Sequence, residues 1–449
     1  MALPKSRLFF WLLVSSVFIV VFILSWGDYS RNISLAAFSV TNRSAETSHF
    51  WDLIRNSTPL SIVFNLTRAA KTADSEKTNP VTKLKVDQMR SSTHAAVAET
   101  PMPILYRSSF KKAPQWDFDD VYNQDAPPRP WTCAESLRNN EDESFKKAFL
   151  PNIRVFLHKD NINMSEWNRL SHFNNPFGFM QFPYDEVMSA VKLIPKPKEP
   201  LLLPKPGSGG CVRCAVVGTG GILNGSKMGK EIDAHDYVFR MNGAVTEGYE
   251  EDVGNRTSVY VHTAHSINAS PYFFSKFGYK AAPHDEGIKY VMIPEGMRDY
   301  NWLGGLLRGE RITNGSYKNR RPRTYYSGQY NESRFYVLHQ DFLRYVKNRF
   351  LKSRSLNSSH WAIVRPTNGA FALFLALQTC DTVSAYGFIT EDYKKYNNYY
   401  FQRNVKTHII FYSNHDYMLE MKMWKKLHDS KILWLYQGPD SGKGTEKPK

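Results

Sequence analysis

Residues 211–262 constrain the fold of this chain more than any other segment. An apolar, β-branched run over Ala215–Val217 is followed at once by the glycine-rich turn Gly218–Gly221. Such a run predicts a buried strand, and the turn after it can present backbone N–H groups to a ligand. Taken by itself, the turn fits a tight connection as well as a phosphate-binding loop. A second strand is predicted over Tyr237–Met241, and it ends at Asn242.

The glycine turn does not match the dinucleotide-binding fingerprint. The pattern G-x-G-x-x-G starting at Gly218 requires a glycine at position 223, where this chain has Leu223. No acidic residue closes a βαβ unit at the usual distance. The turn therefore does not predict a dinucleotide cofactor.

Short apolar runs alternate with helix-like stretches from residue 211 onward. This alternation predicts an α/β fold with a mostly parallel sheet. The predicted strands are Ala215–Val217, Tyr237–Met241, Ser258–Val261, Lys289–Ile293, Thr382–Phe388 and Ile432–Leu435. The predicted helices are Leu338–Phe350, Gly369–Thr379 and His415–Leu427.

The first 100 residues predict a membrane anchor followed by a stem. Residues 1–7 carry two positive charges, and residues 8–26 are uncharged and strongly apolar. A helix needs roughly 20 such residues to span a bilayer. We expect a cytoplasmic tail over 1–7, a transmembrane signal anchor over 8–26 and a mostly disordered stem over 27–100. The alternative, a cleaved signal peptide, also places the rest of the chain outside the cytosol.

The remainder of the chain predicts one large domain over residues 101–437 and a disordered tail over 438–449. Within the domain, the segment Pro195–Pro206 reads PKPKEPLLLPKP, and its prolines exclude a helix. This connector leads directly into residues 211–262.

The formal net charge of +16 favours acidic partners, among them nucleic acid, anionic membranes and acidic small molecules. Eleven Asn-x-Ser/Thr sequons fit a chain exposed to the glycosylation machinery. A lumenal compartment argues against nucleic acid as a partner. The sequons lie at Asn32, Asn42, Asn56, Asn65, Asn163, Asn224, Asn255, Asn268, Asn314, Asn331 and Asn357.

Four cysteines, Cys133, Cys211, Cys214 and Cys380, predict two disulfides in an oxidising compartment. Four cysteines allow three pairings, and the residues alone leave the pairing open. Cys211 and Cys214 also form a C-x-x-C, but there is no second C-x-x-C or nearby histidine pair at zinc-ligand spacing.

Two segments near the C-terminus carry candidate site residues. Thr367, Asn368 and Gly369 lie at the expected start of an apolar helix, where they either cap the helix or help to bind an anion. His415 and Glu420 follow the run IIFYSN, and a histidine is the usual general base for a hydroxyl group. At a spacing of five residues the two side chains need not touch.

Two further patterns predict no metal site. Asp117-Phe118-Asp119 has the form D-x-D, but it lies far upstream of the glycine turn, so we expect a solvated loop. His262 and His265 form an H-x-x-H without an evident third ligand.

Four segments in order resemble the conserved motifs of the animal sialyltransferases, glycosyltransferase family 29. The phrases HDYVFRMNGAV, VSAYGFITE and FYSNHDYMLE are most similar to the subgroup of GalNAc α-2,6-sialyltransferases, types 1 and 2. The segments are residues 211–262 (long motif), 366–388 (short motif), 399–402 (third motif) and 415–420 (very short motif).

The resemblance implies a single Rossmann-like (GT-A-variant) domain and a role for individual residues. It implies His415 as the catalytic base. It implies disulfides Cys214–Cys380 and Cys133–Cys211. It also implies contacts to the donor CMP-sialic acid from Thr219, Asn242, Thr367, Asn368, Gly369, and either Tyr399 or Tyr400.

The chain departs from the family pattern in two places. Thr219 stands where the first turn usually has an asparagine. A tyrosine, Tyr399 or Tyr400 depending on register, stands where the third motif often opens with a histidine. Both departures concern contacts to the donor and not the fold.

The activity that the resemblance implies is transfer of sialic acid from CMP-sialic acid to the 6-hydroxyl of O-linked GalNAc on mucin-type glycoproteins. An inverting displacement is expected, without a metal or other cofactor, in the Golgi lumen. The alternatives are a sialyltransferase of another linkage, such as α-2,3 to galactose, and an inactive membrane-anchored relative that binds glycan or CMP-sialic acid.

Overall fold

The computed structural model describes residues 99–127, 129 and 133–439. The expected tail, anchor and nearly all of the stem lie outside these residues, as does the end of the C-terminal tail. Within the described residues, no helix combines the length and apolar character needed to cross a bilayer.

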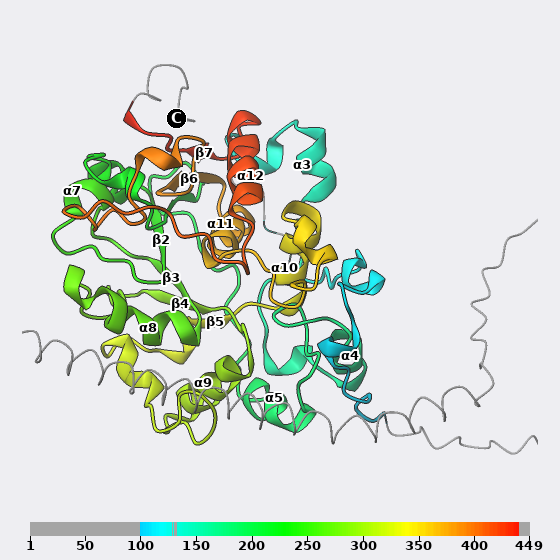
Figure 1. Cartoon of the computed structure of the whole chain (residues 1–449). Coiled ribbons are helices and arrows are strands. Elements are labelled where there is room, and N and C mark those ends of the chain that lie inside the picture. Colours follow the sequence, from blue (N-terminus) through cyan, green and yellow to red (C-terminus); the bar gives the residue numbers. More distant parts are fainter. Residues whose placement is uncertain (1–98, 128, 130–132, 440–449) are drawn as a thin grey trace, which may run out of the picture. The chain divides into compact units, whose positions relative to one another are not determined.

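A seven-stranded sheet forms the centre of the fold, in the order β5-β4-β3-β2-β1-β6-β7 (Figure 1). Every strand pair is parallel, which confirms the predicted α/β class. The strands are β1 (Arg213–Val217), β2 (Tyr237–Met241), β3 (Val259–His262), β4 (Lys289–Met292), β5 (Phe335–Val337), β6 (Thr382–Tyr386) and β7 (Trp434–Leu435).

Helices connect the strands and cover the sheet. They are α3 (Glu143–Ala148), α4 (Met164–Leu170), α5 (Tyr184–Val191), α6 (Gly229–Asp233), α7 (Glu250–Val253), α8 (Ala264–Phe274), α9 (Met297–Arg308), α10 (Gln340–Tyr345), α11 (Asn368–Thr379) and α12 (Tyr417–Asp429).

Most predicted boundaries shift by one or two residues, and two of the helices differ for local reasons. The helix predicted over Leu338–Phe350 is α10 followed by a π-helical turn, Val346–Phe350. The helix predicted from His415 begins at Tyr417, because the side chain of Asp416 accepts a hydrogen bond from the Leu419 N–H and caps it. Strand β5 was not predicted, since three residues are too short a run to show a period.

Alternate residues of β1 pack into different cores, so both faces of the sheet are covered. Cys214 and Val216 belong to the larger cluster, together with the buried side chains of α11. Ala215 and Val217 belong to a second cluster on the opposite face. A parallel sheet buried on both faces requires strands that are apolar throughout, which explains the continuous apolar run at β1.

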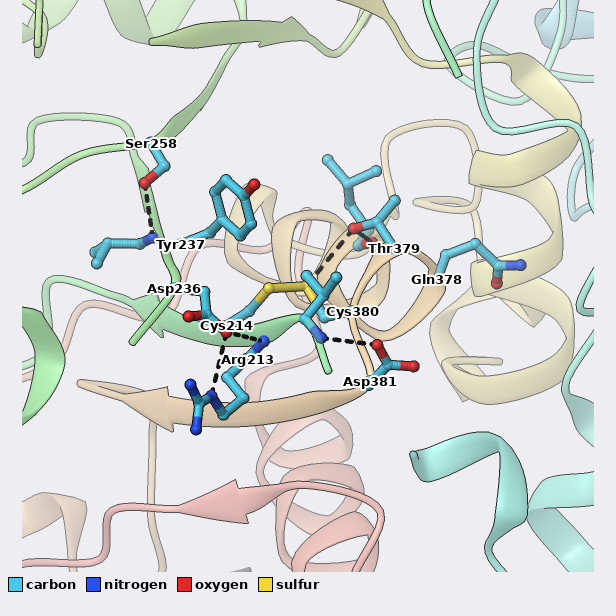
Figure 2. The surroundings of a disulfide bond; sticks show 12 residues. Arg213, Cys214, Asp236, Tyr237, Ser258, Gln378, Thr379, Cys380 and Asp381 are labelled. Atoms are coloured by element: carbon cyan, nitrogen blue, oxygen red, sulfur yellow. Dashed lines mark hydrogen bonds and ion pairs between the residues drawn. A yellow bond between two sulfur atoms is a disulfide. The ribbon is translucent and has the colours of Figure 1, made fainter. Parts of the chain in front are cut away.

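Both disulfides that the resemblance implied are present, Cys133–Cys211 and Cys214–Cys380. Figure 2 shows the second bridge, which ties β1 to Cys380, the residue that follows α11. The Asp381 carboxylate next to it accepts a hydrogen bond from the Val212 N–H at 2.8 Å. The disulfide and this hydrogen bond together hold the amino ends of β1 and β6 next to each other.

The expectation of a solvated loop at Asp117–Asp119 is wrong for Asp117. Its side chain is buried and forms an ion pair with the buried ammonium of Lys347. The backbone carbonyls of Asp119 and Val121 accept hydrogen bonds from Arg344. Arg344 of α10 and Lys347 of the π-helical turn thus hold this acidic segment against the domain. Both residues lie more than 200 positions away, so the sequence around Asp117 could not predict the contacts.

Candidate active site

The sheet has a topological switch point between β1 and β6. From β1 the strands extend through β2, β3 and β4 to β5, whereas β6 and β7 lie on the other side of β1. In open parallel sheets, ligands bind outside the carboxyl ends of the strands at such a point. A cavity of about 1110 Å³ lies there, lined by the turns that follow β1 and β6 and by His415.

The glycine turn after β1 is shaped by close packing against the turn after β6. The N–H groups of Gly218 and Gly220 donate to the carbonyls of Tyr386 and Gly387 at 2.7 and 3.0 Å. A Cβ atom on either glycine would lie 2.6 Å from the Gly387 oxygen. The turn is therefore structurally required, and Thr219 within it lines the cavity.

Asn242 ends β2 in a left-handed conformation, with φ of 52°. This backbone is uncommon outside glycine, although asparagine adopts it more readily than most residues. Its Oδ1 accepts a hydrogen bond from Nδ2 of Asn368 at 2.8 Å, and both residues line the cavity. The bond joins the end of β2 to the first turn of α11.

Thr367 caps the amino end of α11. Its Oγ1 accepts from the Ala370 N–H at 3.0 Å and donates to Oε2 of Glu420 at 2.8 Å. The Thr367 N–H donates to Oε1 of Glu420 at 2.7 Å. Burial raises the pKa of Glu420 to about 7, against the two hydrogen bonds from Thr367, which lower it. Asn368 and Gly369 form the first turn of α11 at the cavity, where backbone N–H groups and the helix dipole favour an anion.

His415 lies at the cavity, and each of its ring nitrogens has a hydrogen-bond partner. Its Nδ1 is 2.9 Å from the carbonyl oxygen of Arg365, which can only accept, so Nδ1 carries the proton. Nε2 then keeps its lone pair, and it accepts a hydrogen bond from Nδ2 of Asn414 at 3.3 Å. Burial, with the Arg365 charge second, lowers the pKa of His415 to about 4. The ring is a neutral proton acceptor at physiological pH.

The structure separates the two tyrosines of the third motif. Tyr399 lines the cavity and pairs with Gly220 through an antiparallel bridge. Tyr400 is buried, and its hydroxyl donates to the carbonyl of Val245 instead. Of the two, Tyr399 is the one placed to meet a ligand.

The side chains expected to form the site come together in this one cavity, with the exception of Tyr400. Sequence reasoning missed a second group on the cavity wall, formed by Glu295, Arg298 and Arg365. Arg365 stands immediately before the short motif, but no spacing pattern links it to Glu295, which follows β4.

The H-x-x-H residues face different surroundings. His262 is fully buried, and burial lowers its pKa to about 4. Its ring stacks on Tyr260 at 5.5 Å. His265 lies on α8 and lines the cavity. His262 is thus a core residue, whereas His265 belongs to the cavity wall.

The fold and the cavity define a doubly wound α/β protein with a ligand site at its switch point. The sequence profile described as glycosyltransferase family 29 (sialyltransferase) matches residues 156–432, and the chain belongs to this family. This confirms the resemblance that the four motifs carried.

Curated relatives include two proteins named alpha-N-acetylgalactosaminide alpha-2,6-sialyltransferase 1. The one from Gallus gallus is 46% identical over 78% of this chain and 63% of its own length. The one from Homo sapiens is 45% identical over 77% and 58%. This chain thus spans about three fifths of these two relatives. Alpha-N-acetylgalactosaminide alpha-2,6-sialyltransferase 2 from Mus musculus is 42% identical, over 67% of this chain and 81% of its own length.

The fold is also similar to that of a solved mammalian sialyltransferase. The TM-score is 0.51 at 23% identity, over 69% of this chain and 99% of the other. A second structure, in complex with Gal-beta-1-3GalNAc-ortho-nitrophenol, gives a TM-score of 0.50 with the same identity. At this identity the likeness shows the fold alone.

Proposed function

We propose that this protein transfers sialic acid from CMP-sialic acid to the 6-hydroxyl of GalNAc linked to serine or threonine in mucin-type glycoproteins. The observation that carries the proposal is the state of His415. Its Nδ1 is committed to the Arg365 carbonyl, so Nε2 is a neutral base at the cavity. The names of the curated relatives support the α-2,6 linkage and the GalNAc acceptor.

The chemistry is an in-line displacement at the anomeric carbon of sialic acid. Nε2 of His415 takes the proton of the acceptor 6-hydroxyl as that oxygen bonds to the anomeric carbon. The bond from this carbon to the phosphate oxygen breaks, CMP departs as a phosphate monoester, and the configuration inverts. We assign the N–H groups at the start of α11 the role of stabilising the charge that develops on the phosphate.

The donor is expected to lie along Thr219, Asn242, Asn368, Gly369 and Tyr399. We assign Thr367 a shaping role, because its hydroxyl is already engaged by Ala370 and Glu420. Asn242 likewise uses Oδ1 to hold Asn368. Donor binding thus depends on a pre-formed turn as well as on direct contacts.

We further propose that transfer needs no metal. CMP carries a single phosphate, so no diphosphate bridge has to be clamped, and cationic and N–H groups of the protein can stabilise the leaving group. Transfer measured in EDTA is expected to match transfer in its absence. A loss of activity that added Mg²⁺ or Mn²⁺ restores would contradict this.

The proposed location is the Golgi membrane, with the catalytic domain lumenal and residues 8–26 as a single anchor. Two disulfides in the described domain support an oxidising compartment. The domain bounds 101–437 and the stem 27–100 stay predictions.

The deciding experiment measures CMP release and product linkage. The protein is incubated with CMP-sialic acid and either GalNAc-Ser/Thr glycopeptides or free galactosides, and the product is analysed. CMP release with α-2,6-sialyl-GalNAc is the expected result. An α-2,3 product on galactose supports the other linkage, and CMP-sialic acid binding without turnover supports the inactive relative.

The variant His415→Ala tests the proposed base. It is expected to lose about 10²- to 10⁴-fold in kcat, the usual contribution of general base catalysis. CMP binding and the thermal unfolding midpoint should stay close to wild type, because the donor contacts lie elsewhere in the cavity. Near-wild-type turnover would rule out His415 as the base.

A further inference from the structure

The backbone N–H and carbonyl of Arg365 form hydrogen bonds with Asn414 and His415. The Arg365 N–H donates to the Asn414 carbonyl at 2.9 Å. The Arg365 carbonyl lies 2.9 Å from Nδ1 of His415. The second contact fixes which ring nitrogen carries the proton, so the position of this carbonyl decides where Nε2 points.

The side chain of Arg365 holds the same backbone in place. Its Nη1 donates to the Pro366 carbonyl at 3.0 Å and to Oδ1 of Asn368 at 3.2 Å. Its Nη2 forms an ion pair with Oε1 of Glu295. The side chain is only 9% exposed, so these contacts are largely shielded from water. The guanidinium thereby ties the turn before α11 to the end of β4.

Glu295 is itself a fixed anchor. Nη2 of Arg298 donates to its Oε2 at 2.7 Å, and its backbone carbonyl accepts from the Asn175 side chain. Burial favours a higher pKa for Glu295, but the charges of Arg365 and Arg298 outweigh it and hold the pKa below its usual value. The carboxylate is therefore ionised at neutral pH and available to hold Arg365.

We propose that Arg365, anchored by Glu295, is the positioning residue for His415. This inference rests on the proposed role of His415 as the base. Arg365 acts by holding the carbonyl that selects the Nδ1–H form and aims Nε2 at the acceptor. A misplacement of about 1 Å at a reacting group can cost about 100-fold in rate. Loss of the anchor should therefore lower kcat by a larger factor than it weakens donor binding, which it affects only through the contact of Arg365 with Asn368.

The charges around His415 make the pH dependence of kcat informative, because loss of a purely structural contact would not change the pKa of the ring in a predictable direction. Burial is the main cause of its low pKa; next, Arg365 lowers the pKa, whereas Glu295 raises it. The ring also faces Tyr417, whose pKa burial raises to about 12, so that hydroxyl does not titrate near neutrality. The neighbouring Asp416 carboxylate is occupied by Ser353 and by the Leu419 N–H.

Because Arg365 lowers the pKa of His415 and Glu295 raises it, replacing either residue should shift the pH profile of kcat, in opposite directions. Arg365→Met removes a positive charge, so the pKa of His415 rises and the acidic limb of the kcat profile moves to higher pH. Glu295→Gln removes a negative charge, so the limb moves to lower pH. Both variants should lower kcat about 10- to 100-fold, and the KM for CMP-sialic acid should change by a smaller factor than kcat.

The experiment uses the full chain and measures kcat, KM and the pH profile with CMP-sialic acid and a GalNAc glycopeptide. Arg365→Lys should return the acidic limb of the kcat profile to its wild-type position, because the positive charge is kept. It should restore only part of kcat, because an ammonium group cannot make all the contacts of the guanidinium with Pro366, Asn368 and Glu295. Arg154→Met is the matched control, since Arg154 pairs with Asp125 through two contacts and does not line the cavity. It should leave kcat and the pH profile unchanged.

Wild-type kcat in Arg365→Met and Glu295→Gln, or limbs that shift in the same direction, would overturn the positioning role. Thermal unfolding and CMP binding are measured on every variant. If Arg365→Met does not fold, Arg365→Lys and Glu295→Gln still decide the question. Absence of turnover by the wild-type protein would refute the proposed function itself, which is a separate outcome.

Discussion

His415 and Glu420 show how burial tunes single residues in this cavity. Removal from water disfavours the charged form of each, so the pKa of the histidine falls to about 4 and that of the glutamate rises to about 7. The two groups are not bonded to each other. His415 is held by Arg365, whereas Glu420 holds the Thr367 cap. The neutral His415 ring can accept a proton, whereas Glu420 stabilises the turn at Thr367.

Glu420 should make stability depend on pH in a defined direction. Its pKa is raised from 4.5 to about 7 on folding, so its contribution is fully present below about pH 4.5 and is lost as pH rises through about 7. The shift corresponds to a change on the order of 3 kcal/mol in the free energy of unfolding. Glu420→Gln keeps a partner for the Thr367 N–H and removes this titration.

The measurement is chemical denaturation of both proteins between pH 4.5 and 7.5. The unfolding free energy of the wild type, relative to Glu420→Gln, should fall over this window. Because both proteins contain the same other titrating groups, including His415, the contribution of those groups to the pH dependence cancels in the difference between the two unfolding free energies. Parallel curves would show that Glu420 does not titrate there.

At the scale of elements, the site depends on turns that touch each other closely. The turn after β1 lies against the turn after β6 and against residues 396–399. A Cβ atom on Gly221 would be 2.0 Å from the carbonyl oxygen of Asn397. The Asn397 side chain in turn bonds to the Gln402 carbonyl and the Thr407 N–H. Packing, and not a positive φ, therefore requires glycine at position 221.

Gly221→Ala is expected to lower the free energy of unfolding by about 1–3 kcal/mol, because overpacking forces the backbone to shift. It should also weaken CMP binding, since Tyr399 belongs to the displaced wall. Gly296→Ala is the matched control, because its Cβ would meet nothing closer than 3.5 Å. Thermal unfolding and CMP titration test both variants, and equal effects on stability would contradict the packing argument.

At the scale of the whole molecule, the described residues between 99 and 155 pack against the domain, although the family profile begins only at residue 156. The Phe110 carbonyl accepts from the indole N–H of Trp361 at 3.0 Å, and Trp361 is buried. The buried pair of Lys347 and Asp117 makes a second link. The first of these contacts supports residues 361–365, which lead to the cavity.

Lys347→Met should destabilise the protein by about 3–5 kcal/mol, because it leaves the Asp117 carboxylate buried without its partner. Asp117→Asn alone should also be costly, since the ammonium then lacks a counter-charge. The double variant should recover a large part of the loss. Denaturant unfolding of all three completes a double-mutant cycle, and strictly additive effects would show that the pair is not coupled.

The sequence alone predicted the features that depend on neighbouring residues. The apolar run at β1, the strand ending at Asn242 and the cap at Thr367 are local patterns, and each lies within one or two residues of its predicted place. The cavity residues of the motifs were predicted by resemblance, and the structure brings all but Tyr400 together. The short strand β5 and the start of α12 were missed or shifted because three residues, or one cap, carry too little pattern.

The local sequence determined the class of fold, and the family resemblance indicated the chemical groups of the site, whereas only the tertiary structure decided which of those groups meet. From the four cysteines three pairings were open, and the adjacency of β1 and β6 brings Cys214 to Cys380. The choice of Tyr399 over Tyr400 depends on which ring the second core buries. Arg365 and Glu295 are 70 residues apart and meet only because the carboxyl end of β4 and the amino end of α11 lie at the same edge of the sheet. Contacts between distant segments are set by packing, which no local pattern contains.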